Sequence, residues 1–412
     1  MTASDIRPEV VSQALRQMGA EFRTKDLSER PDMREGHPHL RDHSHYHAFV
    51  GTFLSQRCTD VERLTWSKHP RGPIWKNRLY QDSSTSPSAT EQTPVPATPA
   101  PTPGSEPGAT DLGPQSGSDN AFTARMRRHQ SWYRARVLEA PCGTGPKVTD
   151  TTYFGNMLRA EDAERGLNFL SPMIHKIALE RVRAGKGAIE PFRLLHNMLS
   201  SQPMCFNLLG PLVNDHALAG RLLSSVPGLD VAKVLNVQIE YAPEPAHEYL
   251  GDRTAFDAFI DYRRSDGSRA FVGIETKLTE PFSTTHYDSP SYRRWMRGDR
   301  APWRPDSTTV VDRSEHNQLW RDHLLAIALR DHEPSPYAAC TMILVRHPGD
   351  LSCARVVDGY KKLLRDGDST FLDLPLDQLV GHWRGVATES EEREWLAKLE
   401  TRYLDLGASI GG

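Results

Sequence analysis

Short runs of apolar residues, bounded by polar residues or by glycine and proline, recur in the second half of the chain and are typical of β-strands. Two longer segments, at residues 188–223 and 315–330, have apolar residues at helical spacing. The strand-like runs are residues 234–241, 254–260, 271–277 and 340–346. The resulting order is helix, three strands, helix, strand (αβββαβ). It predicts an α/β fold with a mixed central sheet flanked by helices.

The strand expected at residues 271–277 carries an acid and a base two positions apart. Side chains two apart share one face of a strand, so Glu275 and Lys277 point the same way. The preceding strand carries one carboxylate, Asp257, in its middle. Burying an ionised carboxylate is costly unless it is paired or binds a metal. The pattern therefore indicates a divalent-metal site.

The turn between these two strands decides whether the carboxylates meet. Asp-Gly at residues 266–267, between strand-like runs, is a strong hairpin signal. A two-residue turn would pair Asp257 with Thr276 and leave the aspartate on the wrong face. A three-residue loop that begins one residue earlier pairs Asp257 with Glu275. We expect the three-residue loop, because carboxylates with Cβ atoms about 5 Å apart can share one hard cation.

An aspartate on one strand, followed by Glu-x-Lys on the next, resembles the PD-(D/E)xK nuclease superfamily, also called the restriction-endonuclease-like fold. The predicted αβββαβ order is the core that such nucleases share. The stretches at residues 200–211 and 318–321 are similar to those of bacterial restriction endonucleases in this superfamily. The resemblance covers residues 120–390. The proline of the motif is missing, since Thr254-Ala-Phe256 precede Asp257.

The resemblance implies that Asp257 and Glu275 hold one or two Mg²⁺ ions, for which Mn²⁺ would substitute, with the Thr276 carbonyl as a further ligand. Lys277 would orient or help deprotonate the attacking water and offset charge that develops on the phosphate. Gln318, on the helix that follows, would lie near the metal or the DNA backbone. That helix is expected to begin after Ser314 as its N-cap.

Several alternatives remain open. Asp252 could replace Asp257 as a ligand, although its place before the strand favours a turn. Relatives often add an acid from the first helix or strand, and Glu190 and Glu240 are the candidates here. The motif could instead be structural, with the aspartate capping a turn and the Glu-x-Lys pair on a solvated edge strand.

The charge balance predicts that any contact with DNA is local. The chain has 50 Lys and Arg against 53 Asp and Glu, a formal net charge of −3, so no overall field attracts it to polyanions. Two basic stretches, at residues 125–136 and 292–304, interleave arginine with aromatic residues. The second directly follows the Glu-x-Lys strand. The DNA contacts expected from it are Arg293, Arg294, Trp295, Arg297 and Arg300.

The composition of residues 81–120, which is mostly Pro, Ser, Thr, Gly and Ala, predicts a disordered linker. It separates an N-terminal module, residues 1–80, from the nuclease domain with its helical C-terminal extension, residues 121–412. Five histidines between His37 and His47 could chelate a transition metal, but a solvated loop is the stronger expectation. The module is expected to bind a protein partner or to help hold substrate.

Other features exclude several classes of protein. The five cysteines lack Cys-x-x-Cys spacing, which argues against zinc ribbons and disulfide frameworks. No apolar run is long enough for a membrane span, and the start lacks a signal pattern, so a cytoplasmic location is expected. No phosphate-binding loop of an ATP-driven motor is present.

The leading hypothesis is a magnesium-dependent DNA endonuclease that acts in restriction or another defence against foreign DNA. One alternative is a catalytically inactive, nuclease-like protein that binds nucleic acid or serves as a scaffold. Another is a nuclease for RNA or branched DNA. Because cutting both strands usually needs two active sites, a homodimer is the expected assembly.

Overall fold

The computed structural model describes short segments of the first eighty residues and most of the chain after residue 110. In the second part the described ranges are 111–146, 151–185, 187–283, 285–309 and 315–409. The chain divides into two units, Met1–Ala100 and Pro101–Gly412. In the first, β3 (Ile74–Asn77) pairs antiparallel with β1 (Glu21–Arg23) and with β2 (Val61–Arg63). The histidine-dense segment at residues 37–47 lies outside the described residues, so its role stays a prediction.

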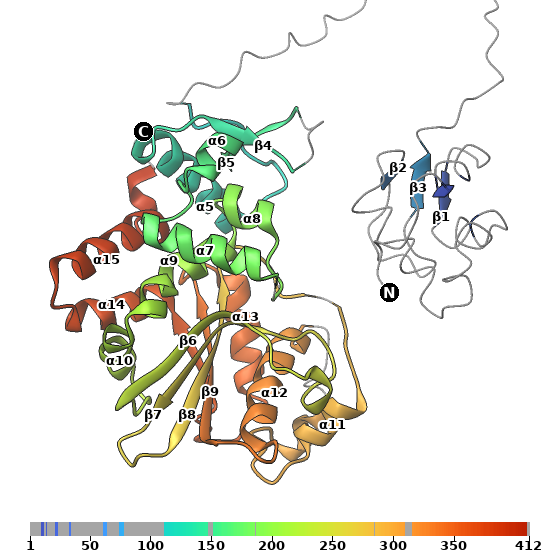
Figure 1. Cartoon of the computed structure of the whole chain (residues 1–412), viewed down its shortest axis with the longest axis vertical. Helices are drawn as coiled ribbons and strands as arrows, with labels where there is room; N and C mark the ends of the chain where they lie inside the picture. The colour runs from blue at the N-terminus through green and yellow to red at the C-terminus, as the bar shows by residue number, and fades with distance from the viewer. Residues whose placement is uncertain are drawn as a thin grey trace, which may run out of the picture. The chain divides into compact units, whose positions relative to one another are not determined.

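The second unit is built on a five-stranded mixed sheet with the order β10-β9-β8-β7-β6 (Figure 1). Its strands are β6 (Lys233–Tyr241), β7 (Phe256–Arg263), β8 (Arg269–Lys277), β9 (Tyr337–Arg346) and β10 (Phe371–Pro375). β7 is antiparallel to both of its neighbours, β6 and β8, while β9 pairs parallel with β8 and β10 pairs parallel with β9. The four predicted strands and the mixed sheet are confirmed, and β10 is an addition that the sequence pattern did not indicate.

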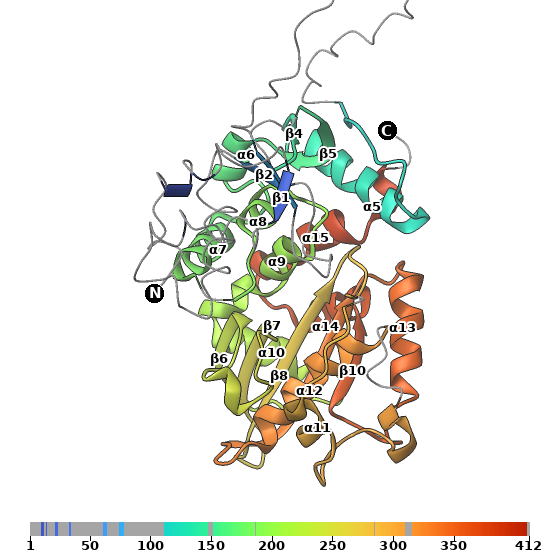
Figure 2. The same ribbon diagram turned by 90° about the vertical axis from the view of Figure 1, so that its right-hand side faces the viewer.

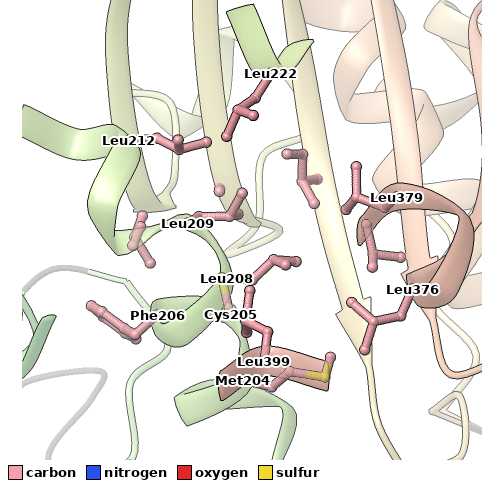
Figure 3. Packing of buried hydrophobic residues seen from close by; sticks show 14 of the residues in the cluster. Met204, Cys205, Phe206, Leu208, Leu209, Leu212, Leu222, Leu376, Leu379 and Leu399 are labelled. Atoms are coloured by element: carbon pink, nitrogen blue, oxygen red, sulfur yellow. The ribbon is translucent and has the colours of Figure 1, made fainter. Parts of the chain in front are cut away.

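Helices cover both faces of the sheet (Figures 1 and 2). The face of Val272 and Ile274 belongs to an apolar cluster that includes side chains of the four helices whose leucines Figure 3 shows at close range. These are α9 (Ser201–Asn214), α10 (His216–Ser224), α14 (Leu376–Val386) and α15 (Ser390–Tyr403). The face of Phe271 packs on three other helices, α11 (Pro290–Met296), α12 (Asn317–Asp331) and α13 (Leu351–Lys361). The αβββαβ core is confirmed.

Smaller elements precede this core and pack beside it. They are α5 (Ala121–Trp132), the π-helix η2 (Tyr133–Val137), β4 (Cys142–Thr144), β5 (Tyr153–Leu158), α6 (Ala160–Glu164), α7 (Pro172–Ala184) and α8 (Pro191–His196). Short 3-10 turns lie at η3 (Ala246–Glu248), η4 (Pro305–Thr309) and η5 (Leu406–Ser409). No helix in the described ranges is long and apolar enough to cross a membrane.

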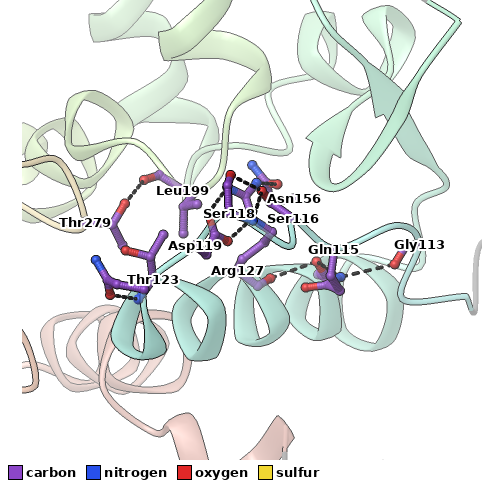
Figure 4. A network of polar contacts seen from close by, with 12 residues as sticks. Gly113, Gln115, Ser116, Ser118, Asp119, Thr123, Arg127, Asn156, Leu199 and Thr279 are labelled. Atoms are coloured by element: carbon purple, nitrogen blue, oxygen red, sulfur yellow. Dashed lines mark hydrogen bonds and ion pairs between the residues drawn. The ribbon is translucent and has the colours of Figure 1, made fainter.

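Residues 111–120, which the composition assigns to the linker, contact this part of the fold. Asp119 pairs with Arg127 of α5, and Arg127 also donates to Asn156 of β5 (Figure 4). The Pro114 carbonyl accepts from the Gly155 amide. The packed unit therefore begins before residue 121.

The β7–β8 hairpin has the predicted three-residue loop. Arg263 pairs with Arg269, and the Arg264 amide donates to the Ser268 carbonyl across 2.9 Å. Gly267, with a φ of 83°, occupies the left-handed position that closes such loops. This loop fixes the pairing of every residue along the two strands.

Helix α12 differs from the expectation at its start. It begins at Asn317, and His316 is its N-cap residue. Ser314, the expected N-cap, lies outside the described residues. The displacement leaves Gln318 in the first turn of the helix.

Candidate active site

Asp257 and Glu275 lie on the neighbouring strands β7 and β8, next to the last pair between these strands. The antiparallel pairing ends at Ala258 and Ile274, so Asp257 directly precedes, and Glu275 directly follows, the last paired residue of its strand. Lys277 shares the face of Glu275, and its Nζ lies 3.0 Å from Glu275 Oε1. The structure therefore joins Glu275 and Lys277 directly, whereas Asp257, on the neighbouring strand, contacts Thr276.

The Asp257 carboxylate is held by the backbone and side chain of Thr276. Its Oδ2 accepts from the Thr276 amide across 2.8 Å and from the Thr276 hydroxyl across 2.6 Å. Burial raises the pKa of Asp257 well above its ordinary value, and the charges on Glu275 and Glu240 act in the same direction. This carboxylate is therefore stabilised by anything that brings positive charge to it, a proton or a metal cation.

Lys277 is an ammonium ion in this arrangement. Burial alone would lower its pKa, but the charge on Glu275 and its hydrogen bond outweigh burial and raise the pKa above its ordinary value. The ring of Phe282 lies 5.4 Å from Nζ and covers it. A lysine with this environment can orient groups and stabilise negative charge, but it is poorly suited to accept a proton.

Gln318 bridges the Glu275 strand and the loop that follows it. Its Nε2 donates to Glu275 Oε1 across 2.9 Å, and its Oε1 accepts from the Ser283 amide across 2.9 Å. Helix α12 thus supplies an amide that fixes the orientation of the Glu275 carboxylate. The residue lies beside Glu275, and the place near the metal or the DNA backbone that the resemblance implies for it stays a prediction.

Asp322 is a fourth charged group of the site, and the sequence reasoning missed it. It follows Gln318 by one helical turn, and its side chain is 5% exposed. Burial raises the pKa of Asp322 well above its ordinary value, and the charge on Glu275 raises the pKa further. Within the described ranges its Oδ2 has no hydrogen-bond partner. Its spacing of four residues from Gln318, which puts both side chains on one face of the helix, was the signal that could have revealed it.

Of the two candidates for an additional acid, Glu240 lies beside the motif. It stands opposite Asp257 in the β6–β7 register, between the pairs on either side of it. Its φ is 59°, a left-handed conformation that is rare for glutamate, and its Oε2 accepts from the Ala188 amide across 3.0 Å. The Glu190 carboxylate instead caps α8 and accepts from the Arg193 amide across 2.6 Å.

Asp252, the alternative to Asp257, has a structural environment. It accepts from the Thr254 amide across 2.8 Å, and the Tyr292 hydroxyl and the Arg321 guanidinium also contact it. Burial would raise its pKa, but the hydrogen bonds from Thr254 and Tyr292 hold it below the ordinary value. This is the turn role that its position before β7 favoured.

The arginine-aromatic stretch does not form one continuous surface. Trp295 is buried, and its Nε1 donates to the Tyr249 carbonyl across 2.9 Å, so its ring cannot stack on a base in this conformation. Arg293 pairs with Asp288 across 3.0 Å. Arg294 and Arg297 are exposed, and the Arg294 guanidinium lies over the Trp295 ring.

Arg300 is remote from the acids. It pairs with Asp331, thirteen residues beyond Gln318 on α12, which corresponds to about 20 Å of helix. Its guanidinium also donates to the carbonyl of Ala338, near the start of β9. Because β9 runs parallel to β8, that start lies at the end of the sheet away from Glu275.

The first basic stretch comes closer to the site. The ring of Phe122 in α5 lies 4.9 Å from the ring of His347, and the His347 amide donates to the Lys277 carbonyl across 3.3 Å. Arg125 is exposed and lies one turn further along α5. Burial lowers the pKa of His347 to about 4, and the charge on Arg125 acts in the same direction.

The family model of the PD-(D/E)XK nuclease superfamily matches residues 117–405. The chain belongs to this superfamily. The matched range contains the whole sheet and every residue of the site described above, so membership in the PD-(D/E)XK superfamily indicates nuclease activity. No curated protein and no solved structure matches the chain.

PD-(D/E)XK nucleases generally use divalent metals, and the donor set here fits a hard cation. Asp257 and Glu275 offer carboxylate oxygens, and the backbone carbonyl of Thr276 offers another. In the described part of the chain, no group of three or more His, Cys, Asp or Glu side chains could hold a metal ion. Two carboxylates suit Mg²⁺, which keeps several of its waters when it binds to proteins.

Proposed function

We propose that this protein is a magnesium-dependent endonuclease that hydrolyses phosphodiester bonds in DNA. The observation that carries the proposal is the place of Asp257 and Glu275 on neighbouring strands beside the last β7–β8 pair, with Lys277 bonded to Glu275. These side chains are buried or half-buried, where unpaired charge is costly. A role in restriction or another defence against foreign DNA belongs to the same proposal and rests on the resemblance alone.

Each residue has a distinct role in the proposed reaction. A bound Mg²⁺ lowers the pKa of its water and polarises the phosphate. Asp257, Glu275 and the Thr276 carbonyl would hold it. The Lys277 ammonium would stabilise negative charge that develops on the phosphate oxygens, a role that its raised pKa favours over that of general base. Gln318 would keep the Glu275 carboxylate in orientation.

Glu240 is the proposed additional acid. It would act through a water ligand, because its own carboxylate already accepts from Ala188. The charge on Glu275 contributes to the raised pKa of Glu240, after burial as the largest cause, which supports their proximity. Glu190 is less suited, because its carboxylate is occupied at the start of α8.

The proposed DNA contacts are backbone contacts from exposed arginines. Arg125 of α5 is favoured by the proximity of its helix to the end of β8. In the second stretch, Arg294 and Arg297 have exposed side chains that take no part in the ion pairs described above. A homodimer would bring two such sites to one duplex, and the N-terminal module would bind a protein partner or help hold substrate.

Plasmid cleavage tests the function. Supercoiled DNA is incubated with the full chain in Mg²⁺, Mn²⁺ or EDTA, beside single-stranded RNA and a branched DNA substrate. We expect metal-dependent nicking or linearisation of the plasmid that disappears in Lys277→Ala and persists in Lys361→Ala, which removes an exposed lysine of α13. Binding without cleavage in any metal would contradict the proposal, as would cleavage of RNA or branched DNA only.

A further inference from the structure

The buried carboxylate of Asp322 has no assigned role in the nuclease site. Its Oδ2 lacks a hydrogen-bond partner in the described part of the chain, although the side chain is almost fully buried. A buried carboxylate oxygen without a partner is costly, so its presence calls for an explanation, and use in another state of the protein is one. Asp322 lies on α12, the helix that also places Gln318 on Glu275.

A second observation concerns the counter-charge of Lys277. In this structure its ammonium pairs with Glu275 Oε1, the same oxygen that accepts from Gln318. In the proposed function Glu275 also binds a divalent cation, whose charge would then stand close to the ammonium. A cation on Glu275 would therefore repel Lys277 and leave it without its present partner.

We propose that Asp322 is the alternative counter-ion of Lys277, which accepts the ammonium when Glu275 binds metal. Asp322 is a positioning residue in this proposal and contacts neither metal nor phosphate. Asp322 lies one helical turn beyond Gln318, whose amide donates to the same Glu275 oxygen as the Lys277 ammonium. The unpartnered Oδ2 would become a hydrogen-bond acceptor, and the buried ammonium would stay paired throughout.

This inference rests on the proposed function, because it requires a cation beside Glu275. The experiment is calorimetric titration of the full chain with Mn²⁺, without DNA, for the wild type, Asp322→Asn, Lys277→Met and the double variant. Asp331→Asn, on the same helix but paired with arginines at its far end, is the matched control. Glu275→Gln tests the metal site itself.

We expect Asp322→Asn to weaken Mn²⁺ binding on the order of tenfold, because the ammonium then stays unpaired beside the cation. In the Lys277→Met background the same substitution should change the dissociation constant less than about twofold, since no ammonium needs a partner. Asp331→Asn should bind Mn²⁺ like the wild type. Asp322→Glu should lie closer to the wild type than Asp322→Asn.

Two results would overturn the inference. If Asp322→Asn weakens binding equally with and without Lys277, Asp322 is a direct ligand. If it lowers the melting temperature but leaves Mn²⁺ binding intact, its role is structural. Absence of binding to the wild type would instead contradict the metal site of the proposed function. Should Asp322→Asn fail to fold, Asp322→Ser provides the neutral variant, with near-UV circular dichroism as the check on folding.

Discussion

Gln318 on α12 and Lys277 at the end of β8 both donate to a single oxygen of Glu275, Oε1, across 2.9 Å and 3.0 Å. Two donors on one oxygen fix the carboxylate plane and leave Oε2 outside both of these hydrogen bonds. The orientation of this acid therefore depends on a helix as well as on its own strand.

Removing the amide of Gln318 should slow the reaction while leaving the fold intact. We expect Gln318→Leu to lower kcat roughly tenfold to a hundredfold, the effect of losing one hydrogen bond to a charged group. Gln318→Glu should be more harmful, because it brings a like charge to Glu275. Single-turnover plasmid cleavage measures the change, and Gln378→Ala, an exposed glutamine of α14, is the control. Equal losses in both variants would exclude a specific role for Gln318.

Metal binding should stabilise the protein more strongly as the pH rises. Because its pKa is raised in the folded state, Asp257 stabilises the fold more when it is protonated than when it is charged. This contribution is lost as the pH rises from the ordinary pKa of 3.8 through the higher pKa of the folded state. Below that folded value, Mn²⁺ must displace a proton. At a hundred times its dissociation constant the ion adds about 2.7 kcal/mol, which corresponds to several degrees of melting temperature.

Differential scanning fluorimetry with Mn²⁺ or EDTA, from pH 5 to pH 8, measures this effect. Without metal, the melting temperature of the wild type should fall relative to Asp257→Asn as the pH rises, because the variant lacks the buried charge. A metal-induced shift that is independent of pH, or that survives in Asp257→Asn and Glu275→Gln, would show that Mn²⁺ binds elsewhere.

Gly273 should resist substitution because an aromatic ring occupies the space beside it. A Cβ atom at this position would lie 2.6 Å from Cε1 of Phe256. We expect Gly273→Ala to lower the free energy of unfolding by about 1–3 kcal/mol, and Phe256→Leu to restore part of it. Gly220→Ala, with nothing within 4 Å of the new methyl, is the control in urea denaturation. Similar stabilities for the two alanine variants would contradict this packing.

Exposed arginines that take no part in the ion pairs described above should differ from Arg300, which pairs with Asp331, in their effect on DNA binding. Arg125→Ala and Arg297→Ala should each weaken binding uniformly across sequences and reduce the salt slope by about one. Arg300→Ala should leave affinity unchanged, because its guanidinium is committed to Asp331. Fluorescence anisotropy over a range of salt concentrations distinguishes them. A larger loss for Arg300→Ala would restore the second basic stretch as the main contact.

The sequence predicts those features that depend on neighbours along the chain. Strand alternation gives the shared face of Glu275 and Lys277, and the turn chemistry of Gly267 gives the register of β7 on β8 from Arg263–Arg269 to Ala258–Ile274. Both are local, because the loop and the two strands are contiguous. The αβββαβ order follows from the spacing of apolar residues in the same way.

Features that depend on distant contacts were not predictable. Asp322 reads as an ordinary helical acid until α12 packs on the sheet, and Trp295 reads as an available aromatic until Tyr249 accepts its hydrogen bond. Strand β10 pairs with β9 although helix α13 separates the two strands in the sequence. Such placements depend on tertiary packing, which propensity and period do not encode.

The topology of β8 has a consequence for the order in which the protein matures. Its antiparallel neighbour joins it through a short loop, whereas its parallel neighbour β9 arrives only after α11 and α12. Short loops close faster than long ones, so Asp257, Glu275 and Lys277 should be assembled early and Gln318 and Asp322 late. During folding, the two acids and the lysine would be in place before Gln318 and Asp322 of α12. Catalytic activity would therefore be the last property that the protein acquires.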